Sequence, residues 1–365
     1  MTLRIEVLSS IEACAAMREA WSGLVTDDPA TLNGMDATAM FEWSEAVMRS
    51  LAKEHALHLV CCYQKSEVVG LLPVAINSSH RGHSALRAPT DFYGGRSGLL
   101  LRSADANVLA ALLRGIGSFA PHWKSYSLVV LQGGKSDQVL MQLPLVSGFR
   151  VRRGGLLESP AFPILANEED FRREMSKNLY QALKKSRNRC NAAGGFEVKT
   201  FNTETSSPEL LRYVLQIDGQ SWKESSGTSI TASTSQTEFY SHALPTLARA
   251  GVLFAAVLFY KGQPAAYNFG LCREGVYCCL KLSYVQDLEH YSPGRTITAA
   301  LVELLRERGV QTYDFMGKPD PYKLQWSRSS WRYTRYPARV FNHSLAGRGN
   351  YFMERLRGQL RSESK

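Results

Sequence analysis

The pattern of apolar and polar positions is clearest in the second half of the chain. Three apolar runs of strand length follow one another, at Val252–Tyr260, Ala265–Leu271 and Val276–Val285. The polar stretches KGQP and CREG separate them and have the composition of tight turns. The pattern therefore predicts a three-stranded antiparallel meander.

An amphipathic helix is predicted directly after the third strand. Apolar residues recur there at i, i+3, i+4, i+7 and i+8, namely at Ile297, Ala300, Leu301, Leu304 and Leu305. Ser292 is the predicted N-cap, Pro293 suits the first helical position, and Gly309 stands where the helix should end. A short strand is predicted at Thr312–Gly317, so the order is strand, strand, strand, helix, strand.

The first half repeats this order more loosely. Leu57–Ile76 has the pattern of two strands, Asp105–Ala120 that of a helix and Tyr126–Gly134 that of a strand. Two residue pairs support the repeat, because Tyr63 aligns with Tyr260 and Asp91 with Asp287, at offsets of 197 and 196. We therefore expect an α/β protein of two similar units, over residues 1–160 and 161–340, followed by a basic C-terminal helix or tail over 341–365.

A basic helix is predicted between the two halves, over Asn167–Gly195. Its apolar stripe consists of Phe171, Met175, Leu179, Leu183 and Cys190. Asn167 should cap the start and the two glycines at 194 and 195 should end it. Further along, Ser225–Thr237 is a polar stretch long enough to be a mobile cover.

Composition narrows the class of protein. The chain has 365 residues, of which 44% are hydrophobic and 21% charged, as in ordinary globular proteins. It has no apolar run long enough to span a membrane and no signal-peptide pattern at its start, so a cytoplasmic location is expected. The seven cysteines include no CxxC pair and lie mostly in apolar runs. We expect them to be small buried hydrophobes rather than disulfides or metal ligands, and we expect no metal site.

The net charge of +10 is unevenly distributed. Residues from Lys323 to the C-terminus carry a net +8, and Arg172–Arg189 carries a net +6. Such concentrated positive charge indicates an anionic partner, which would be a phosphorylated cofactor, a nucleic acid or a membrane surface. The alternative for each segment is a solvated helix face.

The sequence Ser292-Pro293-Gly294-Arg295-Thr296 combines a helix start with a cation. A helix N-terminus presents unpaired N–H groups and partial positive charge, and a glycine lets an anion approach the backbone. Arg295 adds a full charge with two-pronged hydrogen bonding. A strand that runs into such a helix is a common phosphate-binding arrangement, although a capped helix with an incidental arginine has the same sequence.

The region from Asn167 to Trp331 resembles the CelD (cellulose-biosynthesis) branch of the GNAT acetyltransferases, which shares a two-unit build with the FemABX peptidyltransferases. The matching residues are Asp287, Ser292-Pro293-Gly294, Gly309, Asp314-Phe315, Tyr322-Lys323 and Trp326. The basic run SKNLYQALKKSRNR and the segment SWKE also resemble parts of that family domain. The stretch HYSPGRT departs from the Gln/Arg-x-x-Gly-x-Gly/Ala loop of single-domain GNATs, and this leaves the acyl donor open.

The resemblance implies two tandem GNAT-like units, the first degenerate and the second catalytic, with acyl-CoA as co-substrate. The pantetheine arm would lie along the strand that ends at Tyr284-Val285. The pyrophosphate would be held by Ser292, Gly294, Arg295 and Thr296. No covalent nucleophile is needed when an amine attacks a thioester directly, because proximity, a base and an oxyanion donor suffice.

The resemblance also suggests roles for single residues. Asp287 is the first candidate base and Asp314 the second, although a carboxylate at a strand end is often a turn or cap residue. Tyr322 is a candidate acid, and Lys323 would hold a phosphate or pair with Asp314. The residues with a suggested substrate-binding role are Trp222, Lys323, Lys184, Arg187 and Asp91, with Arg189 beside them. Core packing or solvation is the alternative for each of these.

Three functions remain open from the sequence. The first is an acyl-CoA-dependent N- or O-acyltransferase that acts on a small amine, an amino sugar or a biosynthetic intermediate. In the second, aminoacyl-tRNA, or less favourably a carrier protein, replaces acyl-CoA, and the basic segments grip the RNA backbone. The third is a non-catalytic component of a polysaccharide-export assembly.

Overall fold

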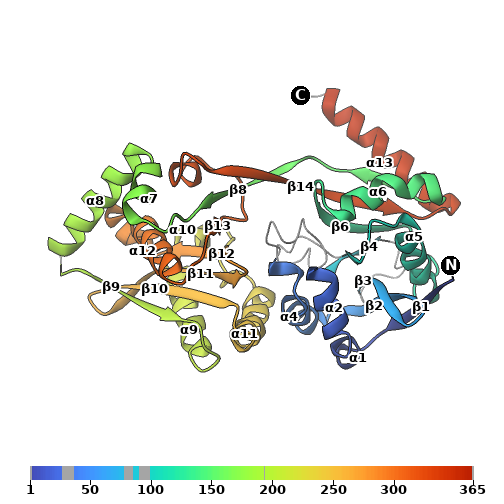
Figure 1. Cartoon of the computed structure of the whole chain (residues 1–365), viewed down its shortest axis with the longest axis horizontal. Coiled ribbons are helices and arrows are strands. Elements are labelled where there is room, and N and C mark those ends of the chain that lie inside the picture. Colours follow the sequence, from blue (N-terminus) through green and yellow to red (C-terminus); the bar gives the residue numbers. More distant parts are fainter. Residues whose placement is uncertain (1, 27–36, 78–84, 90–98, 193, 364–365) are drawn as a thin grey trace. The chain divides into compact units, whose positions relative to one another are not determined.

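The computed structural model describes residues 2–26, 37–77, 85–89, 99–192 and 194–363 (Figure 1). The chain forms two compact units. Unit 1 comprises Met1–Leu157 and Thr334–Lys365, and unit 2 comprises Glu158–Tyr333. The sequence analysis assigned residues 161–340 to one unit and set the tail apart. The structure differs, because the chain returns to unit 1 at Thr334.

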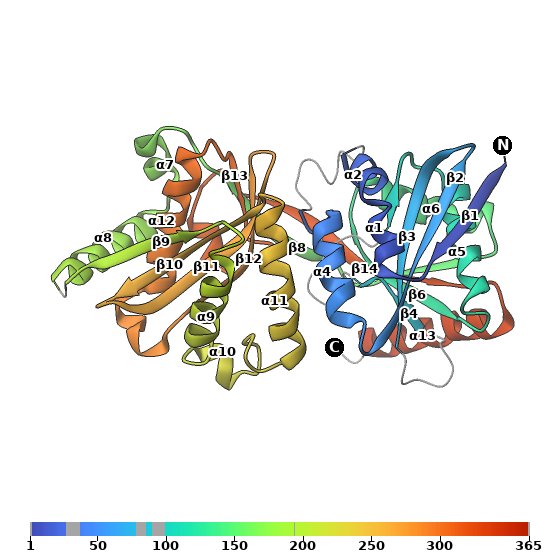
Figure 2. The same cartoon turned by 90° about the horizontal axis from the view of Figure 1, so that it is seen from below.

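Unit 1 is a mixed sheet with helices on both faces (Figure 2). Its strands run in the order β1-β2-β3-β4-β6-β14, with β5 on β3 and β7 on β14. The bounds are β1 (Leu3–Leu8), β2 (His55–Gln64), β3 (Glu67–Asn77), β4 (Ala85–Arg87), β5 (Leu100–Leu101), β6 (Ser125–Leu131), β7 (Arg150–Arg153) and β14 (Trp331–Phe341), which starts in unit 2. The helices are α1 (Ile11–Ala15), α2 (Arg18–Thr26), α4 (Phe41–Leu51), α5 (Ala106–Gly115), α6 (Lys135–Val146) and α13 (Leu345–Glu363), with 3₁₀ turns η1 (Ala37–Ala39) and η3 (Ile116–Ser118).

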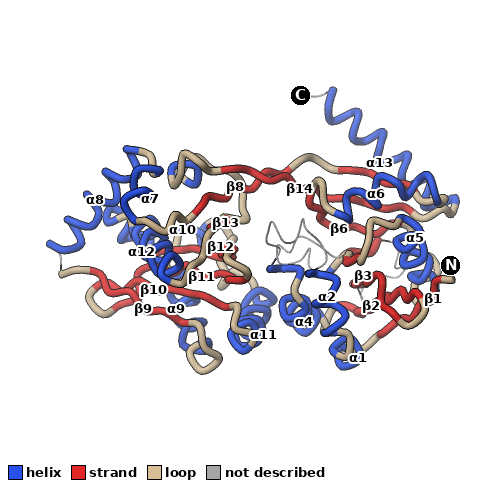
Figure 3. The backbone as a smooth tube through the Cα atoms, viewed as in Figure 1, coloured by secondary structure: helices blue, strands red, loops and turns tan. Residues whose placement is uncertain are grey.

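Unit 2 is built on a sheet in the order β8-β13-β12-β11-β10-β9 (Figure 3). Among the described strand pairs of this unit, β12–β13 is parallel and the others are antiparallel. The strands are β8 (Leu157–Pro163), β9 (Phe196–Phe201), β10 (Leu253–Tyr260), β11 (Gln263–Arg273), β12 (Val276–Tyr284) and β13 (Thr312–Asp314). The helices are α7 (Glu168–Glu174), α8 (Lys177–Ala192), α9 (Ser207–Asp218), α10 (Trp222–Ser225), α11 (Thr234–Arg249) and α12 (Pro293–Glu307), with 3₁₀ turns η4 (Gln286–Tyr291) and η5 (Lys323–Gln325).

The sheet of unit 2 separates two layers of helices. Figure 1 shows α8 and α12 above the strands and α9 and α11 below them. The predicted apolar face of α12 is confirmed, since Ile297, Leu301 and Leu305 are fully buried against the sheet. The predicted meander is confirmed as β10, β11 and β12. Truncating a buried leucine such as Leu301 to alanine should cost about 2–5 kcal/mol.

The sheet of unit 1 is likewise buried on both faces. Adjacent strand residues point to opposite faces, so Cys61 packs with α1, α2 and α4, whereas Cys62 packs with α5 and α6. None of the seven cysteines, all of them among the described residues, forms a disulfide, and all but Cys272 are buried, as their apolar neighbours predicted.

The internal repeat predicted from the sequence is visible in the two hairpins. The β2–β3 turn has Lys65 at φ 56° and the β10–β11 turn has Lys261 at φ 51°. Each hairpin also has a register shift just before its last two residue pairs at the turn. The shift leaves Val69 of β3 without a partner on β2, and Ala265 of β11 without a partner on β10. Each of these positions in the first hairpin lies 196 residues before its counterpart in the second. Tyr63 therefore corresponds to Phe259, and the predicted match of Tyr63 with Tyr260 is wrong by one residue.

The single helix predicted over Asn167–Gly195 is two helices. Asn167 caps α7 as predicted, because its side chain accepts from the amides of Glu169 and Asp170. The backbone then leaves the helical conformation at Met175 (ψ 149°), and the amide of Ser176 donates to the carbonyl of Gln325 at 2.9 Å. A hydrogen bond to a distant residue thus accompanies a break in the helix, although the apolar pattern is continuous in the sequence.

The basic C-terminal segment forms α13 in unit 1. Glu354 anchors it, because its carboxylate pairs with Arg152 of β7 and with Arg339 of β14. Its apolar residues Phe352 and Leu356 are exposed. Within the described residues, none of the helices combines the length and the apolar character needed to cross a membrane.

Candidate active site in unit 2

The parallel strands β12 and β13 pair over only part of β12. Their register joins Val276 to Thr312, Tyr277 to Tyr313 and Cys278 to Asp314, and it stops there. Among the described strands, none pairs with β12 on that side from Cys279 to Tyr284. Apart from the Leu282 carbonyl, which accepts from the Lys223 side chain, the backbone groups on this edge can meet an extended ligand, because a strand edge without a partner presents N–H and C=O groups.

A β-bulge lies at the start of this open edge. Gly270 of β11 faces Cys279 and Phe269 faces Lys281, so Leu280 has no partner on β11. Gly270 is required by close backbone approach, since a Cβ there would lie 2.1 Å from the carbonyl oxygen of Cys278. The bulge therefore changes the direction of β12 where its pairing with β13 ends.

The open edge leads into the predicted anion seat at the start of α12. Ser292 is the N-cap residue of α12, as predicted, but it adopts a left-handed conformation (φ 54°) and its side chain makes no capping hydrogen bond. Instead its carbonyl accepts from the amides of Arg295 and Thr296, both at 3.1 Å. These two amides are therefore engaged internally, whereas the structure gives the Gly294 amide no partner within the described residues.

Tyr284 forms the floor of the turn. A Cβ at Gly294 would lie 3.0 Å from the Tyr284 ring, so only glycine lets the backbone approach it closely. Burial and the nearby Glu289 carboxylate raise the pKa of the Tyr284 phenol, and the positive charge of Arg295 opposes them. Arg295 is half-buried and makes no ion pair within the described part of the chain.

The helix α8 holds the turn from one side. Ser186 donates to the carbonyl of Tyr291 and lies 3.0 Å from the Thr296 hydroxyl, and Arg189 donates to the carbonyl of His290 at 2.7 Å. The predicted residue Arg189 is thus engaged with the protein backbone. Lys184 and Arg187 of the same helix are exposed.

The two candidate carboxylates lie in different environments. Asp287 is exposed on η4, directly after β12 and Val285. Asp314 is fully buried, and its carboxylate accepts from the Tyr333 hydroxyl and from the amide of Met316 at 2.7 Å. Its position at the end of β13 is as expected, but its oxygens are engaged by the protein.

Lys323 does not pair with Asp314, so that part of the sequence analysis is wrong. Its ammonium pairs with Asp320 at 2.9 Å and donates to the carbonyl of Lys318 at 2.7 Å. It is 7% exposed, and a Cβ at Gly317 would lie 2.8 Å from its Nζ atom. Lys323 therefore holds the loop after β13 in place. The adjacent Tyr322 ring contacts Phe315 edge-on, and burial raises the pKa of its phenol.

Sequence reasoning missed two lysines that face this region. Trp222, which has a suggested substrate-binding role, is 48% exposed. Its neighbour Lys223 points inward and donates to the carbonyl of Leu282. Lys281 of β12 donates to Gln236 of α11 at 3.3 Å. A lysine in an alternating strand pattern reads as a solvent-facing position, so the sequence offered no signal for Lys281.

Hydrogen bonds hold the stretch Ser225–Thr237, which was predicted to be a mobile cover, against the rest of unit 2. Glu224 accepts from the hydroxyls of Ser229 and Thr231, both at 2.5 Å. The amide of the fully buried Ile230 donates to Asp218 at 2.7 Å. This segment is therefore a fixed wall beside Lys223.

A buried polar network lies beneath the bulge. The side chain of Asn268 joins Tyr277, Tyr313 and Cys279 by hydrogen bonds. Burial raises the pKa of the Cys279 thiol to about 11, so it is protonated at neutral pH. A protonated thiol is a poor nucleophile, so this cysteine is unsuited to a covalent acyl intermediate.

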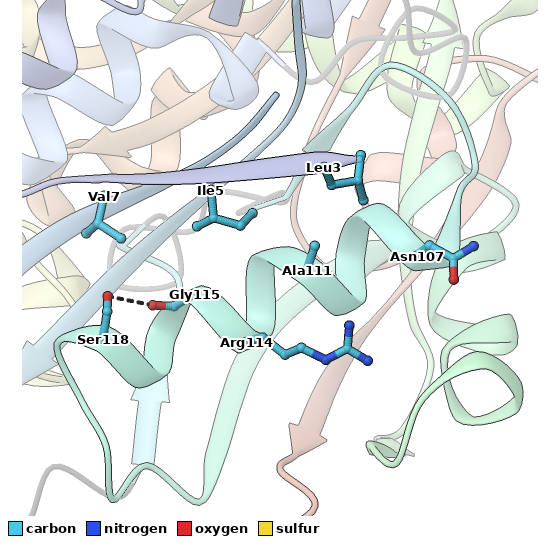
Figure 4. Close-up of a pocket in the computed structure, with 8 residues that line it drawn as sticks. All are labelled: Leu3, Ile5, Val7, Asn107, Ala111, Arg114, Gly115 and Ser118. Carbon is cyan, nitrogen blue, oxygen red and sulfur yellow. Dashed lines mark hydrogen bonds between the residues drawn. The ribbon is translucent and has the colours of Figure 1, made fainter. Parts of the chain in front are cut away.

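The corresponding turn of unit 1 is unsuited to an anion. Asp105 is the N-cap of α5, the position that Ser292 holds in α12, and it accepts from the amide of Asn107 at 2.8 Å, so this helix start carries a carboxylate where unit 2 has a serine. Asp91 lies outside the described residues. The cavity between β1 and α5 is lined by Leu3, Ile5, Val7, Asn107, Ala111, Arg114, Gly115 and Ser118 (Figure 4). Arg114 is the one charged side chain of this lining, so it holds no acid–base pair.

The part of the chain that the structure describes contains no candidate metal site. No group of three or more His, Cys, Asp or Glu side chains has the arrangement of a metal site there.

Comparison with known proteins defines the class of unit 2. Residues 177–324 match the family model described as an acetyltransferase (GNAT) domain. No curated protein matches the chain in sequence. The match lies within unit 2 and includes β12, α12 and β13.

Three solved structures share the fold over almost the whole chain. FemX has a TM-score of 0.61 at 10% identity, covering 97% of this chain and 99% of its own. A conserved protein of unknown function from Bacteroides thetaiotaomicron VPI-5482 has a TM-score of 0.57 at 13% identity, covering 92% and 100%. A tandem GNAT protein from the clavulanic acid biosynthesis pathway has a TM-score of 0.52 at 11% identity, covering 92% and 98%.

Unit 2 is therefore a GNAT acyltransferase domain, and the chain has the tandem build of a double GNAT protein. At these identities the structural likeness defines the fold and leaves the substrates open. The narrower resemblance to the CelD branch stays a prediction.

Proposed function

We propose that the protein transfers an acyl group from acyl-CoA to an amine of a small molecule, an amino sugar or a biosynthetic intermediate. One observation carries the proposal: the open edge of β12 from Cys279 ends at Tyr284, whose ring lies against Gly294 at the start of α12, next to Arg295. An extended pantetheine arm fits a strand edge, and a pyrophosphate fits a helix start with a free amide and a guanidinium.

The reaction is a direct attack. The neutral amine nitrogen forms a bond to the thioester carbonyl carbon, and the C–S bond then breaks to release the coenzyme A thiolate. The β12 backbone near the bulged Leu280 would supply an N–H to the developing oxyanion. Asp287, directly beyond the end of β12, would accept the amine proton, through water if required. Tyr322, which stays protonated because its pKa is raised, would donate to the thiolate.

Thermal unfolding with and without acetyl-CoA tests the donor site. We expect acetyl-CoA to raise the Tm of the wild type and to have a much smaller effect on Arg295→Glu, because the variant repels the pyrophosphate. Arg308→Glu, at the other end of α12, controls for charge reversal on the same helix. Equal responses of the wild type and Arg295→Glu would show that the pyrophosphate assignment is wrong.

The aminoacyl-tRNA alternative is supported by the exposed cations Lys184 and Arg187 on α8. A tRNA donor predicts a copurifying absorbance near 260 nm that RNase removes, and binding that weakens steeply with salt. An acyl-CoA donor predicts coenzyme A released on denaturation. Failure to bind either would favour the non-catalytic assembly component.

A further inference from the structure

Two lysines from different elements converge beside β12 in unit 2. Lys281 follows the bulged Leu280 on β12, and Lys223 is the second residue of α10. Lys223 donates to the carbonyl of Leu282, the residue after Lys281, and Lys281 donates to Gln236. Both side chains are half-buried. Burial, and then the nearby positive charge of Lys223, lower the pKa of Lys281 to about 8.

Neither lysine forms an ion pair with a carboxylate of the described residues. Within the described residues, neither ammonium lies within 4.0 Å of an acidic oxygen. Asp218 acts on both electrostatically, but its oxygens already accept from the Tyr267 hydroxyl and the Ile230 amide, each at 2.7 Å. Withdrawing two like charges from water without a counter-ion is costly, and a bound anion would remove that cost.

The lysine pair lies on the acceptor side of the proposed reaction centre. Lys281 contacts Gln236 and lies 5.9 Å from the Tyr240 ring, both on α11. Figure 1 shows α11 below the sheet and α12, with the proposed donor seat, above it. A thioester that enters along β12 from α12 would therefore meet a nucleophile that enters from the side of Lys281. This placement rests on the proposed function.

We propose that Lys223 and Lys281 form a subsite for an anionic group, a carboxylate or a phosphate, that the acyl acceptor carries near its nucleophilic nitrogen. Two ammonium groups on separate elements grip an anion from two directions. The subsite selects zwitterionic or phosphorylated amines over neutral ones. An amine without an anionic group leaves both ammonium charges uncompensated. The free-energy cost of these uncompensated charges disfavours such an acceptor more strongly than a missing apolar contact would.

The experiment titrates the full-length protein at pH 7 with succinate and, separately, with inorganic phosphate, at constant ionic strength set by chloride. Calorimetry measures affinity, and thermal unfolding gives an independent readout. We expect a saturable heat with the wild type, at least about tenfold weaker binding with Lys223→Met and Lys281→Met, and recovery with Lys281→Arg. Lys261→Met, on the exposed turn between β10 and β11, is the matched control and should bind as the wild type does. The preferred anion identifies whether the acceptor group is a carboxylate or a phosphate.

Two outcomes overturn the proposal: no saturable binding of either anion by the wild type, or the same affinity in Lys281→Met. An acetyl-CoA titration separates this failure from that of the proposed function. Lys281→Met should retain the acetyl-CoA response and lose succinate or phosphate, whereas Arg295→Glu should do the opposite. Loss of acetyl-CoA binding in every variant, with anion binding still dependent on the lysines, would remove the donor assignment and leave the anion subsite.

Discussion

The hydroxyl of Tyr333 donates to both carboxylate oxygens of Asp314, at 3.0 and 2.9 Å. The same carboxylate accepts from the amide of Met316, which has a left-handed φ of 54°. These contacts fix the chain at the point where β13 stops pairing with β12. We therefore assign Asp314 a structural role at the divergence of the two strands, and Asp287 remains the candidate base.

Removing this carboxylate should destabilise the fold. Asp314→Ala leaves the Tyr333 hydroxyl and the Met316 amide without their partner, so we expect a loss of about 2–4 kcal/mol in the free energy of unfolding. Tyr333→Phe keeps the Met316 contact and should cost about 1–2 kcal/mol. Urea denaturation at pH 7 measures both. Unchanged stability of Asp314→Ala together with lost turnover would instead identify Asp314 as the base.

Asp287→Asn should separate catalysis from stability. Loss of a positioned general base lowers kcat by about 10²- to 10⁴-fold, whereas an exposed substitution changes stability by less than about 0.5 kcal/mol. Glu307→Gln, exposed on α12, is the control. A variant with wild-type kcat would exclude Asp287 as the base.

The bulge in β12 depends on Gly270. In Gly270→Ala the new methyl group would lie 2.1 Å from the Cys278 carbonyl and 2.7 Å from the Tyr277 ring, so the strands must separate or shift. We expect destabilisation of about 1–3 kcal/mol or more, and loss of the acetyl-CoA response in the folded fraction. Gly117→Ala meets no atom within 4 Å and should leave both properties unchanged. An intact acetyl-CoA response in Gly270→Ala would show that the bulge is not needed for donor binding.

Lys281 should make stability depend on pH with a defined sign. Its pKa is about 8 in the folded chain, below the reference value of 10.5, so between these values the unfolded chain binds more protons. The cost of holding this lysine is fully present below pH 8 and is relieved as the pH rises toward 10.5. Lys281→Met should therefore be more stable than the wild type at pH 7, by about 3 kcal/mol at most, with the difference shrinking at pH 10.

Urea denaturation of both proteins at pH 7 and pH 10 measures this difference. Other groups titrate in both proteins and largely cancel. The stability difference should be independent of pH if Lys281 is not perturbed, and that result would contradict the burial of its charge.

Local patterns predicted most of the secondary structure of unit 2. The apolar runs that became β10, β11 and β12, and the spacing of Ile297, Leu301 and Leu305, are properties of a few consecutive residues. The glycines at 194 and 195, with φ of 106° and 82°, end α8 for a reason that is equally local. The break at Met175–Ser176 could not be predicted in this way, because its cause is the carbonyl of Gln325.

The candidate site shows the same distinction between local features, which the sequence predicted, and contacts between distant residues, which it did not. The sequence by itself determined that a glycine and an arginine start a helix soon after a strand, and that Asp314 stands at a strand end, because these facts depend on neighbours in the chain. The 3₁₀ turn η4, which carries Asp287 between β12 and α12, was not predicted. Only the tertiary structure decided that Asp314 is closed off by Tyr333, that Lys323 holds Asp320, and that Lys223 meets Lys281 across 58 residues. The physical reason is that these contacts follow from strand register, from one bulged residue and from the burial of charge, and those are settled only when distant segments pack together.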